Sequence, residues 1–196
     1  MKGWRAQVAA IVRAEEDENS DLHEIVGVPG FPVSSRVTIL VHPGDASGEA
    51  GIDTALAGMA RELEERMDAG CGVIVLHRFS SVYMDPRHDY AVRERAPVRD
   101  WFRAVARACN DRQSWQLYGD HLDDFSARVA PVLVRADEIL VTGLWGDAAD
   151  GCAAQVVRHL SQAGLPVRLG EHVPRAWARE KDPVPRPEED GPEGPT

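Results

Sequence analysis

Residues 37–78 read VTILVHPGDASGEAGIDTALAGMARELEERMDAGCGVIVLHR, and this stretch decides the fold. It opens with a continuous run of β-branched and aliphatic residues that stops at a Pro-Gly pair, which is typical of a strand buried on both faces. From 51 to 69, apolar residues recur every three or four positions opposite a charged face, which predicts a helix. The run 71–78 then repeats the pattern of the first strand. We therefore expect a strand, a helix and a second strand, with the two strands parallel.

Similar elements follow toward the C-terminus. The pattern predicts a helix from Pro97 to Asn110, a helix after Gly119-Asp120 that Pro131 kinks or restarts, a strand over 138–143, a helix from Cys152 closed by Gly164, and a strand over 166–170. Strands that alternate with helices favour a parallel sheet. The expected fold class is α/β: a three-layer, Rossmann-like domain with a mostly parallel sheet covered by helices on both faces.

The chain of 196 residues is expected to hold one folded domain, over 37–180. Before it, residues 1–36 are expected to form an amphipathic helix over 4–14 and an irregular or edge segment rich in proline and glycine. After it, residues 181–196 are acidic and proline-rich, which predicts a disordered tail. The loop 79–96 has no hydrophobic period, which is more typical of a functional lid than of a simple connection.

Charge and composition exclude several classes of partner. The formal net charge is −10, so the average field repels nucleic acid. No apolar run is long enough for a membrane span or a signal peptide, so no membrane partner is expected. The three cysteines form no Cys-x-x-Cys pair, which argues against a disulfide framework and favours a reduced, cytoplasmic location. Large apolar helix faces and tryptophans expected at the surface make a homodimer plausible.

Ligands of parallel α/β sheets bind beyond the carboxyl ends of the strands, so the residues just past each strand are the candidate site. They are His42 and Asp45 after the first strand, His77 and Arg78 after the second, Trp145 and Asp147 after the third with Cys152 on the next helix, and Glu171 and His172 after the fourth. The alternative is that strand ends are simply polar and that the histidines satisfy turn carbonyls. Their number together favours a site.

Cys152 stands near the start of a predicted helix, where unpaired amides and the helix dipole favour a thiolate and could hold an oxyanion. Asp147 and Asp150 lie within a turn of the thiol. Their charge opposes its ionisation unless one of them caps the helix or accepts the proton. A small buried core cysteine is the competing interpretation.

No cofactor is expected, because the sequence has neither Gly-x-Gly-x-x-Gly nor a P-loop, and it has no Gly-x-Ser-x-Gly serine elbow. Imidazoles and carboxylates could still bind a metal through His77, Asp85 and His88, with Asp89 adjacent. A hydrated loop is the simpler explanation of the same residues. The metal dependence stays open at this point.

The order of these segments resembles the isochorismatase-like cysteine hydrolases, a family that includes nicotinamidases. The resemblance covers roughly 37–170 and is carried by VTILVHPGD, VIVLHRFSS, GDHLDDFSARVAPVL and ILVTGLWGDAADGCAAQVV. It implies an α/β fold in which Asp45 ends the first strand as a catalytic acid and Cys152 opens a helix as the nucleophile. The family's catalytic lysine has no counterpart, since Lys2 and Lys181 are the only lysines.

These observations together predict a small-molecule amide or ester hydrolase. Cys152 would be the nucleophile, Asp45 or His77 would carry the proton, and the substrate contacts would come from His42, Arg78, Trp145 and Asp147. The alternative is a non-catalytic relative of the same fold that binds a small ligand or a partner subunit.

Overall fold

The computed structural model describes residues 22–28, 30–32, 34–45, 52–78, 95–119, 121–144 and 151–174, apart from the side chains of His23 and Asp45. The predicted N-terminal helix, residues 79–94 of the predicted lid and the acidic tail lie outside these residues. No helix among the described residues has both the length and the apolar content that crossing a bilayer requires.

The centre of the fold is a six-stranded sheet in the order β1-β4-β3-β2-β5-β6. The strands are β1 (His23–Val26), β2 (Arg36–Val41), β3 (Gly72–His77), β4 (Ser114–Tyr118), β5 (Glu138–Gly143) and β6 (Val167–Leu169). Every neighbouring pair is parallel except β1 and β4, which pair antiparallel. The predicted mostly parallel sheet is therefore confirmed.

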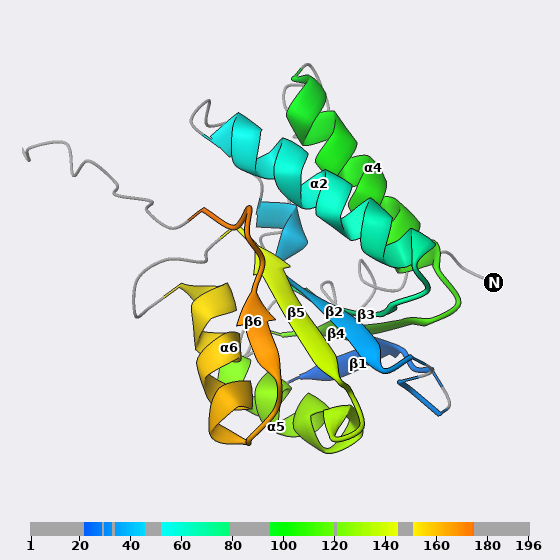
Figure 1. The fold of residues 1–196 in the computed structure, drawn as a ribbon, viewed down its shortest axis with the longest axis vertical. Coiled ribbons are helices and arrows are strands. Elements are labelled where there is room, and N and C mark those ends of the chain that lie inside the picture. Colours follow the sequence, from blue (N-terminus) through cyan, green and yellow to red (C-terminus); the bar gives the residue numbers. More distant parts are fainter. Residues whose placement is uncertain are drawn as a thin grey trace, which may run out of the picture.

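Helices cover both faces of the sheet. Figure 1 shows α2 (Asp53–Asp68) and α4 (Ala96–Asn110) side by side on one face, and α5 (Leu122–Leu133) and α6 (Cys152–Gln162) on the other. Each pair of helices closes its own apolar core against the sheet. This arrangement confirms the predicted three-layer α/β class.

The apolar side chains of β2 and β3 serve both cores, because successive residues of a strand face opposite sides. Val41 and Leu76 pack toward α5 and α6, whereas Leu40 and Val75 pack toward α2 and α4. This explains why both segments read as continuous hydrophobic runs instead of alternating ones.

Two strands were not predicted as such. The sequence pattern predicted no strand at 114–118, yet all five residues of β4 are buried there. The apolar run is interrupted by Ser114 and Gln116, whose polar groups hid the pattern; the amide of Gln116 is accommodated by donating to the carbonyl oxygen of Cys109 at 2.7 Å. Strand β1 lies in the predicted irregular lead-in and joins the sheet at its edge, beside β4.

A network of charges at the amino end of the sheet joins three strands to α2. Arg66 of α2 is 5% exposed, and it donates to the hydroxyl of Thr38 at 2.6 Å, to the carbonyl oxygen of Val37 at 3.1 Å and to Glu138 at 2.9 Å. Glu138 also accepts hydrogen bonds from Arg36 on β2 and Arg168 on β6, at 2.9 and 3.0 Å. Burial raises the pKa of Glu138, but its three arginines outweigh this and lower it to about 2.

The tryptophans contribute differently from what the sequence suggested. Trp101 is fully buried and Trp115 is 6% exposed, so the two tryptophans in the described part of the chain offer no exposed aromatic surface for a partner. The homodimer stays a prediction.

Candidate functional site

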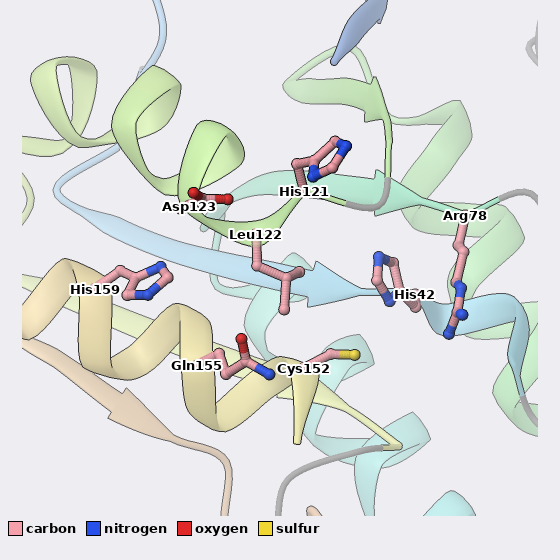
Figure 2. Close-up of a pocket in the computed structure, with 8 residues that line it drawn as sticks. All are labelled: His42, Arg78, His121, Leu122, Asp123, Cys152, Gln155 and His159. Carbon is pink, nitrogen blue, oxygen red and sulfur yellow. The ribbon is translucent and has the colours of Figure 1, made fainter. Parts of the chain in front are cut away.

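A pocket of about 560 Å³ opens at the carboxyl edge of the sheet, on the face covered by α5 and α6. It is lined by His42, Arg78, His121, Leu122, Asp123, Cys152, Gln155 and His159 (Figure 2). Strand order explains this gathering. Because β2 lies between β3 and β5, the chain leaving each of the three strands passes the same edge of the sheet.

His42 follows β2 directly and has a left-handed backbone conformation, with a φ of 46°. Its amide donates to the carbonyl oxygen of Leu76 on β3 at 2.9 Å, and the indole Nε1 of Trp101 holds the next residue by donating to the carbonyl oxygen of Pro43 at 2.9 Å. These two hydrogen bonds stabilise a backbone conformation that residues other than glycine seldom adopt. The turn thereby fixes the imidazole at the pocket.

The imidazole of His42 is 1% exposed, and neither ring nitrogen has a hydrogen bond of normal geometry to a described residue, although the backbone of Gly119 lies close enough to interact with the ring. Burial and the positive charge of Arg78 lower the pKa of His42 to about 4, although hydrogen bonding to the backbone of Gly119 raises it to a lesser extent. The ring is therefore neutral at pH 7. It presents one N–H donor and one acceptor nitrogen.

Cys152 is the first residue of α6, and Gly151 at the N-cap has no side chain with which to cap the helix. The thiol is partly exposed, whereas Cys71 and Cys109 are buried. In Figure 2 the Cys152 side chain points from the start of α6 toward the side of the pocket that holds His42 and Arg78. The sulfur therefore lies at the positive end of a helix dipole, which favours a thiolate, and Arg78 lines the same pocket.

The remaining lining residues come from α6 and from the start of α5. Gln155 and His159 follow Cys152 at helical spacing, so α6 presents one polar stripe to the pocket. His121 is the N-cap residue of α5, and Asp123 lies in its first turn. None of these four residues was expected at the site from the sequence. The helical spacing of Gln155 and His159 from Cys152 could have identified these two residues. His121 and Asp123 reach the pocket only because the tertiary fold brings the start of α5 to it.

Three of the predicted site residues meet in this pocket: His42, Arg78 and Cys152. Trp145 and Asp147 lie outside the described residues, as do Asp85, His88 and Asp89 of the predicted metal loop. The backbone of Asp45 ends a 3-10 turn, η1 (Pro43–Asp45), that begins directly after His42, and its side chain is not described. Glu171 and His172 are exposed beyond β6, the edge strand, and do not line the pocket.

His77 does not reach the pocket. It is fully buried, and its Nε2 lies 3.1 Å from Oε1 of Gln116. Because the Gln116 amide nitrogen donates to the carbonyl oxygen of Cys109, its oxygen faces His77, and Nε2 of His77 is therefore the donor. Burial lowers the pKa of His77 to about 4. His77 was predicted to carry a proton at the pocket. In the structure it lies inside the core, between β3, β4 and α4.

A group of possible metal ligands lies at the start of α5, and two of its three residues, His121 and Asp123, line the pocket. His121, Asp123 and Asp124 each offer one ligand atom, and these atoms lie within 4.8 Å of one another. All three side chains are exposed.

Comparisons with known proteins give likenesses of fold. No protein-family model matches the sequence, and neither does any curated protein. Among solved structures, the chain is similar to the pyrazinamidase/nicotinamidase from Streptococcus mutans UA159, with a TM-score of 0.47 and 12% sequence identity over 72% of this chain and 87% of that chain. It is also similar to an isochorismatase from Pseudomonas putida KT2440, with a TM-score of 0.48 and 17% identity over 69% of this chain and 68% of that chain. At this level of identity, the function has to be argued from the residues of this chain.

Proposed function

We propose that the protein is a small-molecule hydrolase that cleaves an amide or ester bond, with Cys152 as the nucleophile and His42 as the proton carrier. The observation that carries the proposal is that a helix-opening cysteine and a buried, neutral imidazole line one pocket. A nucleophile and a base that face the same cavity are the minimum that covalent acyl transfer requires.

The reaction proceeds in two halves. The Cys152 sulfur attacks the substrate carbonyl carbon while its proton passes to His42, and the amides at the start of α6 stabilise the negative oxygen. His42 then protonates the leaving amine or alcohol, and a thioester remains. Water attacks the thioester, gives its proton to His42 and releases the carboxylic acid, and the thiol regains its proton.

The low pKa of His42 is compatible with this role. A neutral imidazole has a lone pair available at pH 7, whereas a protonated one could not accept the thiol proton. When the proton moves, the new thiolate stabilises the imidazolium by its opposite charge. Arg78 lowers the pKa of His42 in the resting protein, and its charge also stabilises the thiolate and could bind an acidic part of the substrate.

The roles expected for the remaining predicted residues stay part of this proposal. Asp45 follows His42 in the same turn, so it is a candidate second proton carrier. Trp145 and Asp147 are candidate substrate contacts on the segment that leads to Cys152.

The test is turnover of a panel of small primary amides, aryl amides and aryl esters by the full chain and its variants. Cys152→Ala should lower kcat/KM by about a thousandfold or more, and His42→Asn by at least about a hundredfold. Asparagine is suited to position 42 because it tolerates the left-handed conformation but is not a base. Cys71→Ala is the matched control, since Cys71 precedes β3 at the opposite end of the sheet, and it should keep its activity.

Undiminished turnover in Cys152→Ala would reject the nucleophile. If the wild-type chain hydrolyses nothing on the panel but its melting temperature rises with one of the amides or esters, the non-catalytic ligand-binding alternative replaces the hydrolase.

A further inference from the structure

A second pocket, of about 380 Å³, lies at the edge of the sheet where β1 pairs with β4. Its lining is mostly apolar and only partly buried, with Val28 and Phe31 from the segment after β1 and Val132 from the end of α5. Trp115 of β4 also lines it, and its ring centroid lies 5.8 Å from that of Phe31. An apolar cavity of about 150 Å³ is enough for benzene, so this pocket has room for an aromatic side chain with aliphatic neighbours.

The charge at this pocket is negative. Glu24 is the only charged residue among the described residues that line it. Its carboxylate accepts a hydrogen bond of 2.7 Å from the indole Nε1 of Trp115 and lies 4.0 Å from the guanidinium of Arg128. Because the side chain of Glu24 is 44% exposed, its charge can also attract a basic partner. The pocket therefore favours an apolar occupant that carries basic residues.

The chain itself has a segment of this kind shortly before β1. Residues 4–14 are predicted to form an amphipathic helix, and its apolar residues recur at helical spacing: Trp4, Val8, Ile11 and Val12. Residues 1–14 contain one lysine and two arginines but no acidic residue, although the whole chain has a net charge of −10. The segment thus combines an apolar face with the charge that complements Glu24.

The place of this segment along the chain favours it over other occupants. Leu22 packs against the core beneath α5 and α6, and Glu24 lines the pocket, so the chain joins the fold beside the pocket. The link from 14 to 22 can span up to about 26 Å, and such a short tether raises the effective concentration of the segment to about millimolar. The acidic tail 181–196 instead follows β6, at the opposite edge of the sheet, and has the same sign of charge as Glu24.

We propose that residues 4–14 dock into this pocket as a helix, with Trp4 and its apolar neighbours against Phe31 and Val132. The contact covers apolar side chains that the described residues leave partly exposed, and it shields β1, an edge strand of the described sheet. It is independent of the proposed hydrolysis, because the candidate site lies at the start of α5 and this pocket at its end.

The experiment is photo-crosslinking within the full chain. The photoreactive amino acid benzoylphenylalanine replaces Arg128, whose exposed side chain approaches Glu24 at the pocket, and irradiation attaches it to the neighbouring segment. We expect a crosslink to peptides from 4–14 of the same chain, with a yield unchanged on roughly tenfold dilution because the contact is intramolecular. The same amino acid in place of Arg61, exposed on α2 on the other face of the sheet, should not label these peptides (Figure 1).

Two variants of the segment test whether its apolar face makes the contact. Trp4→Ala should lower the yield of the Arg128-position crosslink at least about fivefold, because the tryptophan supplies the largest apolar surface. Arg13→Gln is the matched control. Residue 13 lies on the side of the predicted helix opposite Trp4, so this change should alter the yield by less than about twofold. Circular dichroism checks that each variant remains folded.

Other occupants of the pocket give different products. A crosslink between two chains whose yield falls on dilution would place a second copy there, and a crosslink to residues 175–196 would place the tail there. Either result overturns the proposal. It is also overturned if no peptide from 4–14 is labelled, or if Trp4→Ala and Arg13→Gln lower the yield equally.

Discussion

The indole Nε1 of Trp101 in α4 donates a hydrogen bond of 2.9 Å to the carbonyl oxygen of Pro43, the residue directly after His42. A fully buried side chain on the α2 and α4 face of the sheet thereby holds the turn that supplies a pocket histidine on the opposite face. The left-handed backbone of His42 depends on such contacts, because residues other than glycine seldom adopt it.

Trp101→Phe should therefore affect both stability and activity. It leaves a buried carbonyl oxygen without its donor and creates a small cavity, which together cost about 2 kcal/mol or more of unfolding free energy. It should also lower kcat/KM more than a core substitution of equal cost in α5, such as Phe125→Leu, which lies in the core on the other face of the sheet. Urea unfolding and steady-state kinetics on the two variants measure this. Equal activity in two equally destabilised variants would show that Trp101 acts through packing alone.

Glu138 is predicted to stabilise the amino end of the sheet through Arg66. Glu138→Gln keeps the shape but leaves the guanidinium of Arg66, which is 5% exposed, without its countercharge. We expect a loss of about 2 kcal/mol, because removing one partner of a mostly buried pair is costly. Asp100→Asn breaks the exposed pair with Arg103 and should cost no more than about 0.5 kcal/mol. Urea unfolding of both variants at one salt concentration distinguishes them, and equal losses would contradict the role given to Glu138.

The predictable parts of the fold were the segments whose pattern is local. β2, β3 and β5 are continuous apolar runs, and α2 repeats at helical spacing, so each element carries its own signal. β4 carries no such local signal, because the polar residues Ser114 and Gln116 lie inside a buried strand. They are accommodated there only through contacts of the tertiary structure.

The candidate site shows the same limit. Because parallel strands end at one edge, the order of elements made His42, Arg78 and Cys152 candidates for one site, but only the strand order in the structure brings them into one pocket. The position of His77 could not be predicted in this way, because successive side chains along β3 face opposite sides of the sheet. Its neighbour Leu76 packs toward α5 and α6, and His77 therefore turns toward α4 and Gln116.

The acid stability of the protein should depend on His77. Burial lowers its pKa from an ordinary value of 6.5 to about 4, so the unfolded chain binds the proton more readily than the folded chain. Stability is then fully present above about pH 6.5 and is lost as the pH falls toward 4, by about 2 kcal/mol at pH 5 for one such histidine. His42 has the same direction of shift and adds to the loss.

The variant His77→Gln removes the titrating group and keeps a donor for Gln116, so it should lose less stability than the wild type between pH 7.5 and pH 5. Urea unfolding at both pH values measures the difference. His172→Gln replaces an exposed imidazole and should leave the pH dependence as in the wild type. An unchanged acid loss in His77→Gln would mean that other groups cause it.

The last prediction concerns the order in which the thiols react. Cys71 and Cys109 are 5% and 4% exposed, whereas Cys152 is partly exposed at the start of α6 and faces the pocket. Alkylation requires an accessible thiolate, and the helix dipole and Arg78 favour one at Cys152. One equivalent of iodoacetamide at neutral pH should therefore modify Cys152 first, and peptide mass spectrometry identifies the labelled site. In denaturant all three thiols should react alike, and His42→Asn should slow the labelling of the folded chain if His42 accepts the thiol proton. Labelling of Cys71 or Cys109 at the same rate in the folded chain would contradict a selectively activated Cys152.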